Sequence, residues 1–196
     1  MATPLLYLAS RSPRRRALLD QIGIDYRVVA VGVEEIPQAG EKAEDFVRRM
    51  ALEKALAGWA SPAVRRRNPV LGADTVVVLD GVLLGKPRDE ATAHDQLSRL
   101  SGRQHDVLSA VAMVWNTHQA VRLSRSRVWF RHLSPDMIER YCATGEPLDK
   151  AGSYAIQGRA ALFIRRLEGS YSGVMGLPLF ETGELLCAAK LEAWID

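Results

Sequence analysis

The sequence predicts a mixed α/β fold, because segments with strand character alternate with segments of helical spacing. Residues 5–9, Leu-Leu-Tyr-Leu-Ala, form an unbroken apolar run that is typical of a strand buried on both faces. The Ser-Pro pair at residues 12–13 is typical of a helix start, and Gly23 of a helix end. Asp-Gly at residues 80–81, between two apolar runs, predicts a β-hairpin.

The same patterns predict the other elements. Strands are expected at residues 5–9, 25–31, 70–79, 82–86, 104–115, 120–133 and 161–167. Helices are expected at residues 13–22, 43–59, 90–100, 135–144 and 178–194. Loops are expected at residues 65–69, 116–119 and 169–176, and residues 146–157 are too polar for a core strand.

Bulk composition fits one domain, residues 1–196, and excludes several classes of protein. The 196 residues are 47% hydrophobic and 25% charged, which is ordinary for a globular chain. The net charge is +3, and arginines cluster at residues 14–16, 65–67 and 122–131. Such local clusters fit a small anionic ligand. They do not form the long basic stripe with interleaved aromatic residues that nucleic-acid binding favours, so no nucleic-acid partner is expected.

Cysteine usage and hydropathy bear on the compartment. Cys142 and Cys187 are too few and too isolated for a disulfide framework or a zinc site, and both lie in apolar segments with helical spacing. We expect buried, reduced thiols and a cytoplasmic protein. The apolar run at residues 5–9 is too short for a signal peptide, and no run approaches bilayer length, so no membrane partner is expected.

The first predicted helix start carries candidate phosphate ligands. Ser10, Ser12, Arg14 and Arg15 surround a helix N-terminus, which offers free backbone N–H groups and positive dipole charge. Arginine at this end opposes the dipole, so it calls for a reason, and a bound phosphate supplies one. The alternative is an ordinary helix cap with a solvated basic end.

Lys54 lies on the apolar stripe of the helix predicted at residues 43–59. It follows Phe46 by eight residues and Met50 by four, so it shares the face that packs inward. One interpretation is a cation that points into a cleft and binds phosphate. The other is a side chain whose stem lies on the core while its ammonium group reaches water.

Asp74 lies inside the apolar strand at residues 70–79. A buried carboxylate needs a partner or a ligand, so it is either a general base or metal ligand in a cleft, or a structural group that binds loop amides. Counting back from the hairpin pairs Leu79 with Val82 and sets Thr75 opposite Lys86. Asp74 and Lys86 would then be close but on opposite faces, unless a bulge at residue 85 intervenes.

Three segments resemble the signatures of the Maf family, the nucleoside triphosphate pyrophosphatases. Residues 9–15 read Ala-Ser-Arg-Ser-Pro-Arg-Arg, and residues 72–75, Gly-Ala-Asp-Thr, are followed by Lys-Pro-Arg-Asp at residues 86–89. Residues 149–158 read Asp-Lys-Ala-Gly-Ser-Tyr-Ala-Ile-Gln-Gly. From the residues alone, a solvated ion pair is the default interpretation of Asp149 and Lys150, and the resemblance instead makes this segment the far wall of the site.

The resemblance implies a strongly twisted mixed sheet flanked by helices, in two lobes with a central cleft similar to that of inosine triphosphatases. It implies hydrolysis of a nucleoside triphosphate to the monophosphate and pyrophosphate with Mg²⁺ or Mn²⁺, in a homodimer. Asp74 resembles the catalytic proton acceptor and a metal ligand, and Glu35 resembles a second metal ligand, although Glu34 precedes it. The residues that resemble the phosphate-contacting group are Ser10, Arg14, Arg15, Lys54 and Lys86.

Three positions resemble those that distinguish members of the family. They are Arg14, Thr75 and Gln157, and they match the type that acts on dTTP and UTP rather than on 7-methyl-GTP. CTP or a modified pyrimidine nucleotide could also be a substrate. Two other functions compete: a non-catalytic nucleotide-binding regulator of septum formation, and a nucleic-acid-binding module suggested by the arginine clusters.

Overall fold

The computed structural model describes residues 6–64 and 68–191 of the chain. The strands are β1 (Leu6–Leu8), β2 (Tyr26–Val28), β3 (Val70–Leu79), β4 (Val82–Leu84), β5 (Gln104–Trp115), β6 (His118–Phe130) and β7 (Ile164–Glu168). The helices are α1 (Pro13–Gln21), α2 (Ala43–Trp59), α3 (Glu90–Leu100), α4 (Pro135–Cys142), α5 (Tyr171–Met175) and α6 (Leu179–Ala188). Short 3₁₀ turns are η1 (Glu146–Asp149), η2 (Ala151–Ser153) and η3 (Arg159–Phe163).

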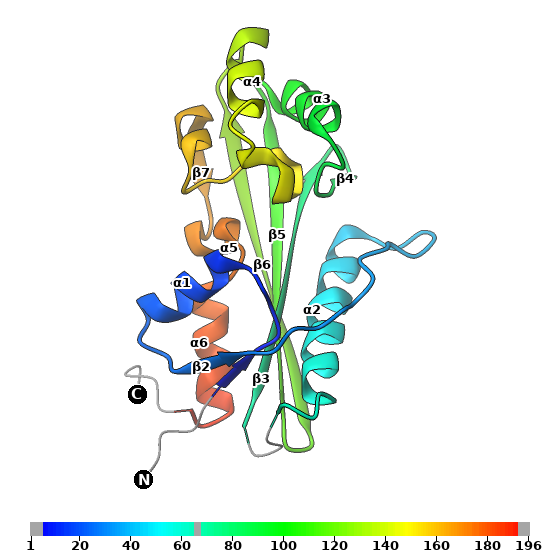
Figure 1. Ribbon diagram of the computed structural model, residues 1–196, viewed down its shortest axis with the longest axis vertical. Coiled ribbons are helices and arrows are strands. Elements are labelled where there is room, and N and C mark those ends of the chain that lie inside the picture. The colour runs from blue at the N-terminus through cyan, green and yellow to red at the C-terminus, as the bar shows by residue number, and fades with distance from the viewer. Residues whose placement is uncertain (1–5, 65–67, 192–196) are drawn as a thin grey trace.

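The strands form one mixed sheet, which confirms the predicted α/β class. Its order is β2-β1-β3-β5-β6-β7, and β4 also pairs with β3. The pairs of β1 with β2 and with β3 are parallel, and the other pairs are antiparallel. The long strands β3, β5 and β6 run through the whole molecule and are strongly twisted (Figure 1).

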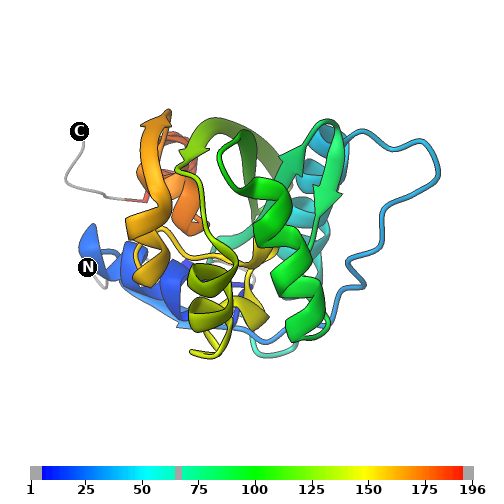
Figure 2. The same ribbon diagram turned by 90° about the horizontal axis from the view of Figure 1, so that it is seen from above.

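The remaining elements gather at the two ends of the long strands (Figure 1). One end holds β1, β2, α1, α2 and α6, and the other holds β4, α3, α4, β7 and the 3₁₀ turns. The segment between β2 and α2 projects away from the body in both ribbon views (Figures 1 and 2). This arrangement gives the molecule two lobes that share the central strands.

The two lobes leave a gap along one edge of β3. On this edge β1 pairs with residues 70 and 71, while β4 pairs with residues 77–79. Within the described residues, no strand pairs with residues 72–76 on this edge. Both Asp74 and Thr75 lie in the gap, and because strand side chains alternate, they point to opposite faces of the sheet.

Separate apolar clusters support the lobes on the two faces of the sheet. Helix α2 packs Phe46, Val47 and Met50 against the even-numbered face of β3 and β5. On the other face, α1 and α6 cover one half of the strands. Helices α3 and α4 cover the other half, together with the 3₁₀ turns. The sheet is therefore flanked by helices on both faces.

Most predicted elements are confirmed, and several differ in their bounds. The turn expected at residues 116–119 is tighter, because Trp115 pairs directly with His118. The strand expected at residues 161–167 begins only at Ile164, after η3, and the loop expected at residues 169–176 contains α5. Helix α6 ends at Ala188 instead of continuing to residue 194. Residues 65–67, 5 and 192–194 lie outside the described ranges.

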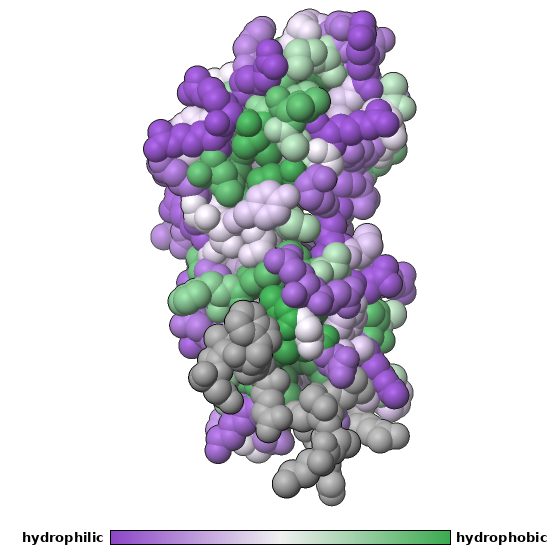
Figure 3. Space-filling view, turned by 90° about the vertical axis from the view of Figure 1, so that its left-hand side faces the viewer, coloured by the Kyte–Doolittle hydropathy of each residue, from purple (hydrophilic) through white to green (hydrophobic). Residues whose placement is uncertain are grey.

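Surface character differs between parts of the molecule. On the side shown in Figure 3, apolar side chains form two areas, and hydrophilic side chains border them. Among exposed large apolar residues are Leu162 and Phe180, each 78% exposed.

The two cysteines differ in exposure. Cys142 is buried as expected, but Cys187 is exposed, since it lies on the outer face of α6. Across the described ranges, no helix is long and apolar enough to cross a membrane.

Candidate active site

A buried lysine joins two carboxylates at the gap in the sheet edge. Lys54 Nζ lies 2.6 Å from Asp74 Oδ1 and 2.6 Å from Glu35 Oε1. The side chains of Lys54 and Asp74 are only 10% and 9% exposed, whereas that of Glu35 is 41% exposed. Burial of these charges is tolerated because each has a partner of opposite sign. Lys54 thus points inward as the helical spacing predicts, and its contact with phosphate stays a prediction.

Gly72 explains why Lys54 reaches Asp74. A Cβ atom at Gly72 would lie 2.3 Å from the carbonyl oxygen of Ala51 and 2.5 Å from the backbone nitrogen of Ala55. Only glycine therefore permits α2 to lie this close to β3. Asp74 follows two residues later on the same face of the strand, directly below the face of α2 that carries Lys54.

Glu35 comes from the projecting segment between β2 and α2, and Arg49 of α2 ties this segment down. The Arg49 guanidinium donates to the carbonyl oxygen of Ile36 at 3.1 Å, and to both carboxylate oxygens of Glu41 at 2.7 Å each. Glu35, and not Glu34, lines the cavity. Glu35 is therefore the glutamate that binds Lys54 together with Asp74.

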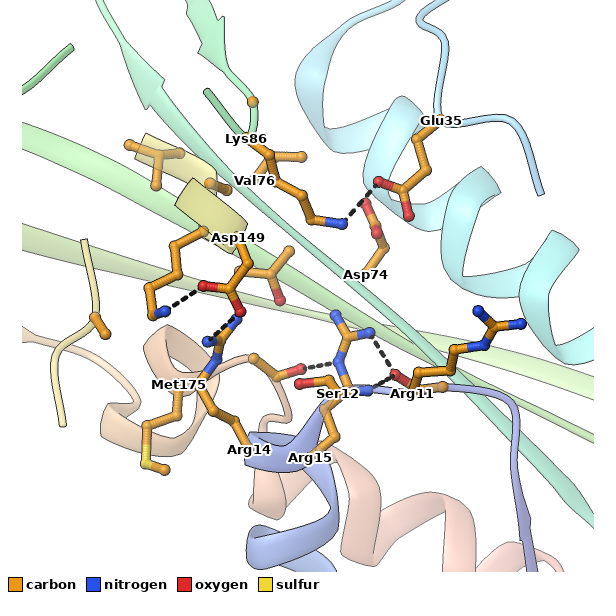
Figure 4. Close-up of a pocket in the computed structure, with 18 of the residues that line it drawn as sticks. Arg11, Ser12, Arg14, Arg15, Glu35, Asp74, Val76, Lys86, Asp149 and Met175 are labelled. Atoms are coloured by element: carbon orange, nitrogen blue, oxygen red, sulfur yellow. Dashed lines mark hydrogen bonds and ion pairs between the residues drawn. The ribbon is translucent and has the colours of Figure 1, made fainter. Parts of the chain in front are cut away.

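Two lysines act on the charge of Glu35. Partial burial raises its pKa, but hydrogen bonds and charge from Lys54 and Lys86 outweigh burial and hold the pKa below its ordinary value. Lys86 Nζ lies 3.5 Å from Glu35 Oε2. The two carboxylates and Lys86 face one another in Figure 4.

The predicted hairpin register holds only near its turn. Leu79 pairs with Val82 as expected, but pairing ends at Val77 and Leu84, so Thr75 is not opposite Lys86. Instead, the carbonyl oxygen of Gly85 accepts hydrogen bonds from Gly152 N and from Gln96 Nε2, each at 3.2 Å. The chain thus leaves the sheet at this residue and carries Lys86 to the cavity.

The start of α1 lies across the cavity from these groups (Figure 4). Arg15 donates from Nε to the carbonyl oxygen of Gly176 at 2.7 Å and from Nη1 to Ser10 Oγ at 3.1 Å. Burial lowers the pKa of Arg15, against the opposing charges of Asp74 and Glu35. The Ser12 side chain makes no capping hydrogen bond in α1, so its predicted capping role is only positional.

Arg14 reaches the third signature segment. Its Nη1 atom lies 3.6 Å from Asp149 Oδ2, and Asp149 also pairs with Lys150. Lys150 Nζ donates to the carbonyl oxygen of Glu146 at 2.7 Å, and its side chain is 12% exposed. Both residues line the cavity, but only Lys150 is largely buried, because the Asp149 side chain is 65% exposed.

The cavity has the size and charge of a nucleotide site. Its volume is about 820 Å³, within the usual range for small-molecule sites. Six cationic and three anionic side chains line it, an excess of three positive charges. The cations are Arg11, Arg14, Arg15, Lys54, Lys86 and Lys150, and the anions are Glu35, Asp74 and Asp149.

The structure brings every predicted site residue into this cavity. These residues are Ser10, Arg14, Arg15, Glu35, Lys54, Asp74, Thr75, Lys86 and Gln157. Arg11 and Lys150 also line it, although the sequence alone assigned them no ligand role. Arg11 falls at the variable position of the first signature, and the Lys150 ammonium could be judged only once its partners were known.

A twisted mixed sheet, a gap in one strand edge and a cation-rich cavity with a lysine-bridged carboxylate pair define a small-anion-binding α/β protein. The chain belongs to the Maf-like protein family, which matches residues 5–189. One relative, the dTTP/UTP pyrophosphatase of Alkalilimnicola ehrlichii, is 58% identical over 93% of this chain and 92% of its own length. Another dTTP/UTP pyrophosphatase, from Methylococcus capsulatus, is 53% identical over 92% of this chain and 89% of its own.

One solved structure is more distantly similar. The Ham1 protein of Staphylococcus aureus is 16% identical, with a TM-score of 0.42 over 64% of this chain and 71% of its own length. This similarity is too low to identify a shared site.

Proposed function

We propose that the chain is a nucleoside triphosphate pyrophosphatase that hydrolyses dTTP and UTP to the monophosphate and pyrophosphate, and so clears nucleotides from the cellular pool. Two relatives of this name are more than half identical to the chain over most of their length. The observation that carries the proposal is the buried Asp74 carboxylate, 2.6 Å from Lys54, in a cavity with excess positive charge.

Asp74 is the proton acceptor in this proposal. A water molecule beside its carboxylate attacks the α-phosphorus and gives up a proton, while the bond to the β-phosphate oxygen breaks. Lys54 keeps the carboxylate in one orientation, because it holds Oδ1 at 2.6 Å. Asp74 Oδ2 makes no such bond to Lys54, so it is the oxygen suited to the water.

The cationic residues stabilise the leaving group. Pyrophosphate departs with more negative charge than it carries in the substrate, so cations that face it lower the barrier. Lys86, which follows β4, and the Arg15 guanidinium, which comes from α1, line the same cavity (Figure 4). Ser10 orients Arg15 through its hydroxyl.

The two carboxylates also suit a divalent cation. Mg²⁺ and Mn²⁺ favour oxygen ligands, and Mg²⁺ is commonly held by one or two carboxylates together with substrate phosphates and water. Asp74 and Glu35 would hold the ion here. When bound, it would neutralise phosphate charge and orient the α-phosphate. The described residues contain no group of three acidic, histidine or cysteine side chains that would hold a metal without substrate.

Arg14, Thr75 and Gln157 select the base in this proposal, and all three line the same cavity. The test is to incubate the protein and Mg²⁺ with dTTP, UTP, CTP, GTP, ATP and 7-methyl-GTP, and to measure pyrophosphate and orthophosphate. Pyrophosphate from dTTP and UTP above the others is the expected result. Orthophosphate as the main product would refute the reaction, and preference for 7-methyl-GTP would refute the substrate type.

A non-catalytic regulator of septum formation is less well supported. Nucleotide binding alone requires cations, and it does not require a buried carboxylate held by one of them.

We also propose a homodimer that acts in the cytoplasm. The exposed side chains of Leu162 and Phe180 are consistent with a subunit contact. Light scattering at several protein concentrations measures the mass, and a constant monomer mass would refute the dimer.

A further inference from the structure

Behind Thr75 lies a serine that the proposed reaction does not use. Thr75 and Ser109 are paired across β3 and β5, and their hydroxyl oxygens lie 2.8 Å apart. Ser109 is only 1% exposed. Its hydroxyl also lies 2.5 Å from the carbonyl oxygen of Gly173 in α5.

Donor and acceptor counting fixes the direction of this chain of hydrogen bonds. A hydroxyl group has one hydrogen, and a carbonyl oxygen can only accept. Ser109 must therefore donate its hydrogen to Gly173. Its oxygen is then free only to accept from Thr75, so the Thr75 hydrogen points to Ser109 and away from the cavity.

The consequence concerns the part of Thr75 that a ligand meets. Thr75 lines the cavity, and its oxygen can offer only lone pairs there, because its hydrogen is committed to Ser109. A ligand atom that contacts Thr75 Oγ1 must be a hydrogen-bond donor. An acceptor atom at this place would meet the lone pairs of Thr75 Oγ1 with no hydrogen between them, and both atoms would be left without a hydrogen bond.

We propose that Ser109 is a specificity-determining positioning residue that locks the Thr75 hydroxyl as an acceptor and so selects pyrimidine bases with a ring N3–H group. This inference rests on the proposed function, in which the base contacts Thr75. Uracil and thymine both carry N3–H. Cytosine has an unprotonated N3, which is an acceptor, and for that reason it is rejected.

The test compares specificity rather than activity alone. In Ser109→Ala the Thr75 hydrogen is released and can turn toward the cavity, so we expect the ratio of kcat/KM for UTP to that for CTP to fall about tenfold. In a Thr75→Val background the same serine replacement should leave the ratio unchanged. An equal fall in both backgrounds would overturn the proposal.

Ser126→Ala is a matched control. Ser126 is also a buried strand serine that binds the segment around α5, since its oxygen accepts from Ser170 N at 2.9 Å, but it does not bond to Thr75. We expect this variant to keep the wild-type ratio. A similar fall in Ser126→Ala would mean that loosening of α5 is responsible and would overturn the proposal.

A second measurement needs no variant. UTP methylated at N3 lacks the donor, and the wild-type protein should use it at least about tenfold less well than UTP. Equal use of both nucleotides, or a preference for CTP through its amino group, would refute the role of N3–H. Absence of hydrolysis of any nucleotide by the wild type would instead refute the proposed function, so the two failures are distinguishable.

Discussion

At the scale of the residue, one buried ammonium group determines the chemistry of the cavity. Lys54 has a carboxylate partner on each side, and one of them, Glu35, remains partly open to solvent. A buried ion pair is a weak source of stability, because apolar side chains of similar size stabilise a fold at least as well. An ion pair that also lines a cavity therefore calls for another reason. The placement of this group therefore indicates function.

Asp74→Asn separates catalysis from structure. The amide keeps an oxygen for Lys54 but cannot accept a proton from water, so we expect kcat to fall about a thousandfold with little change in nucleotide affinity. Pyrophosphate release gives kcat, and calorimetry with a non-hydrolysable UTP analogue gives the affinity. Asp106→Asn is the control, because Asp106 is, like Asp74, a strand aspartate with cationic partners, which in its case are Arg125 and Arg127. Equal loss of binding and turnover in Asp74→Asn would indicate a structural carboxylate.

Lys54→Met should weaken both binding and turnover. The methionine fills the space but leaves Asp74 buried without its cation, so we expect kcat/KM for UTP to fall about a hundredfold. Steady-state kinetics on folded protein, checked by circular dichroism, is the measurement. Lys42→Met, an exposed position at the start of the same helix, should behave like the wild type. Normal activity of Lys54→Met would exclude the role assigned to this lysine.

At the scale of the element, the contact between α2 and β3 sets the geometry of the site. The helix can approach the strand because Gly72 has no side chain, and the approach brings a helix lysine over a strand aspartate. Sequence periodicity predicts the inward face of α2 and thus the direction of Lys54. It cannot predict that Asp74 is the partner, because that depends on the separation of two elements.

Gly72→Ala tests this contact. The added methyl group would lie 2.3 Å from a backbone oxygen that cannot move without the helix, so we expect a loss of about 2–3 kcal/mol in stability. For a chain of this length that corresponds to a fall of about 6 °C in Tm. Thermal unfolding measures it. Gly32→Ala, where a Cβ atom meets nothing within 4 Å, should melt like the wild type. If both variants melt alike, the close approach is not required.

The path of the chain after β4 illustrates what the sequence could not predict. Residue spacing gives the hairpin and the pair of Leu79 with Val82. The position of Lys86 depends instead on two hydrogen bonds that the Gly85 carbonyl oxygen accepts. Their donors, Gln96 and Gly152, lie in other elements of the chain. Long-range polar contacts of this kind leave no local pattern.

At the scale of the whole molecule, the site exists because two lobes cover different lengths of one strand edge. β1 and β4 each pair with one end of β3 and leave its middle open, so the cavity reaches both faces of the sheet. Asp74 faces the carboxylate and lysine side, and Thr75 faces the side of Ser109 and α5. The family resemblance predicts a cleft. Which residues line each face of the sheet in this cleft can be read only from the register of the strands.

A buried histidine in the core beneath α3 and α4 makes the free energy of unfolding depend on pH. His105 is 3% exposed, and burial lowers its pKa from 6.5 to about 4. Between these values the unfolded state binds more protons than the folded state, so stability should fall as the pH falls from 6.5 to 4, by at most about 3 kcal/mol. Urea unfolding at several pH values measures this. The slope should flatten in His105→Gln but not in His132→Gln, which changes an exposed histidine. Equal slopes in the three proteins would contradict the assignment.

The most direct test of the central claim is hydrolysis of UTP in water enriched in ¹⁸O, with the products followed by ³¹P nuclear magnetic resonance. If the cavity activates water toward the α-phosphorus, the label appears in UMP and the pyrophosphate is unlabelled. Label in pyrophosphate or in orthophosphate would mean that a different bond is attacked, and would contradict the role of Asp74 beside the α-phosphate.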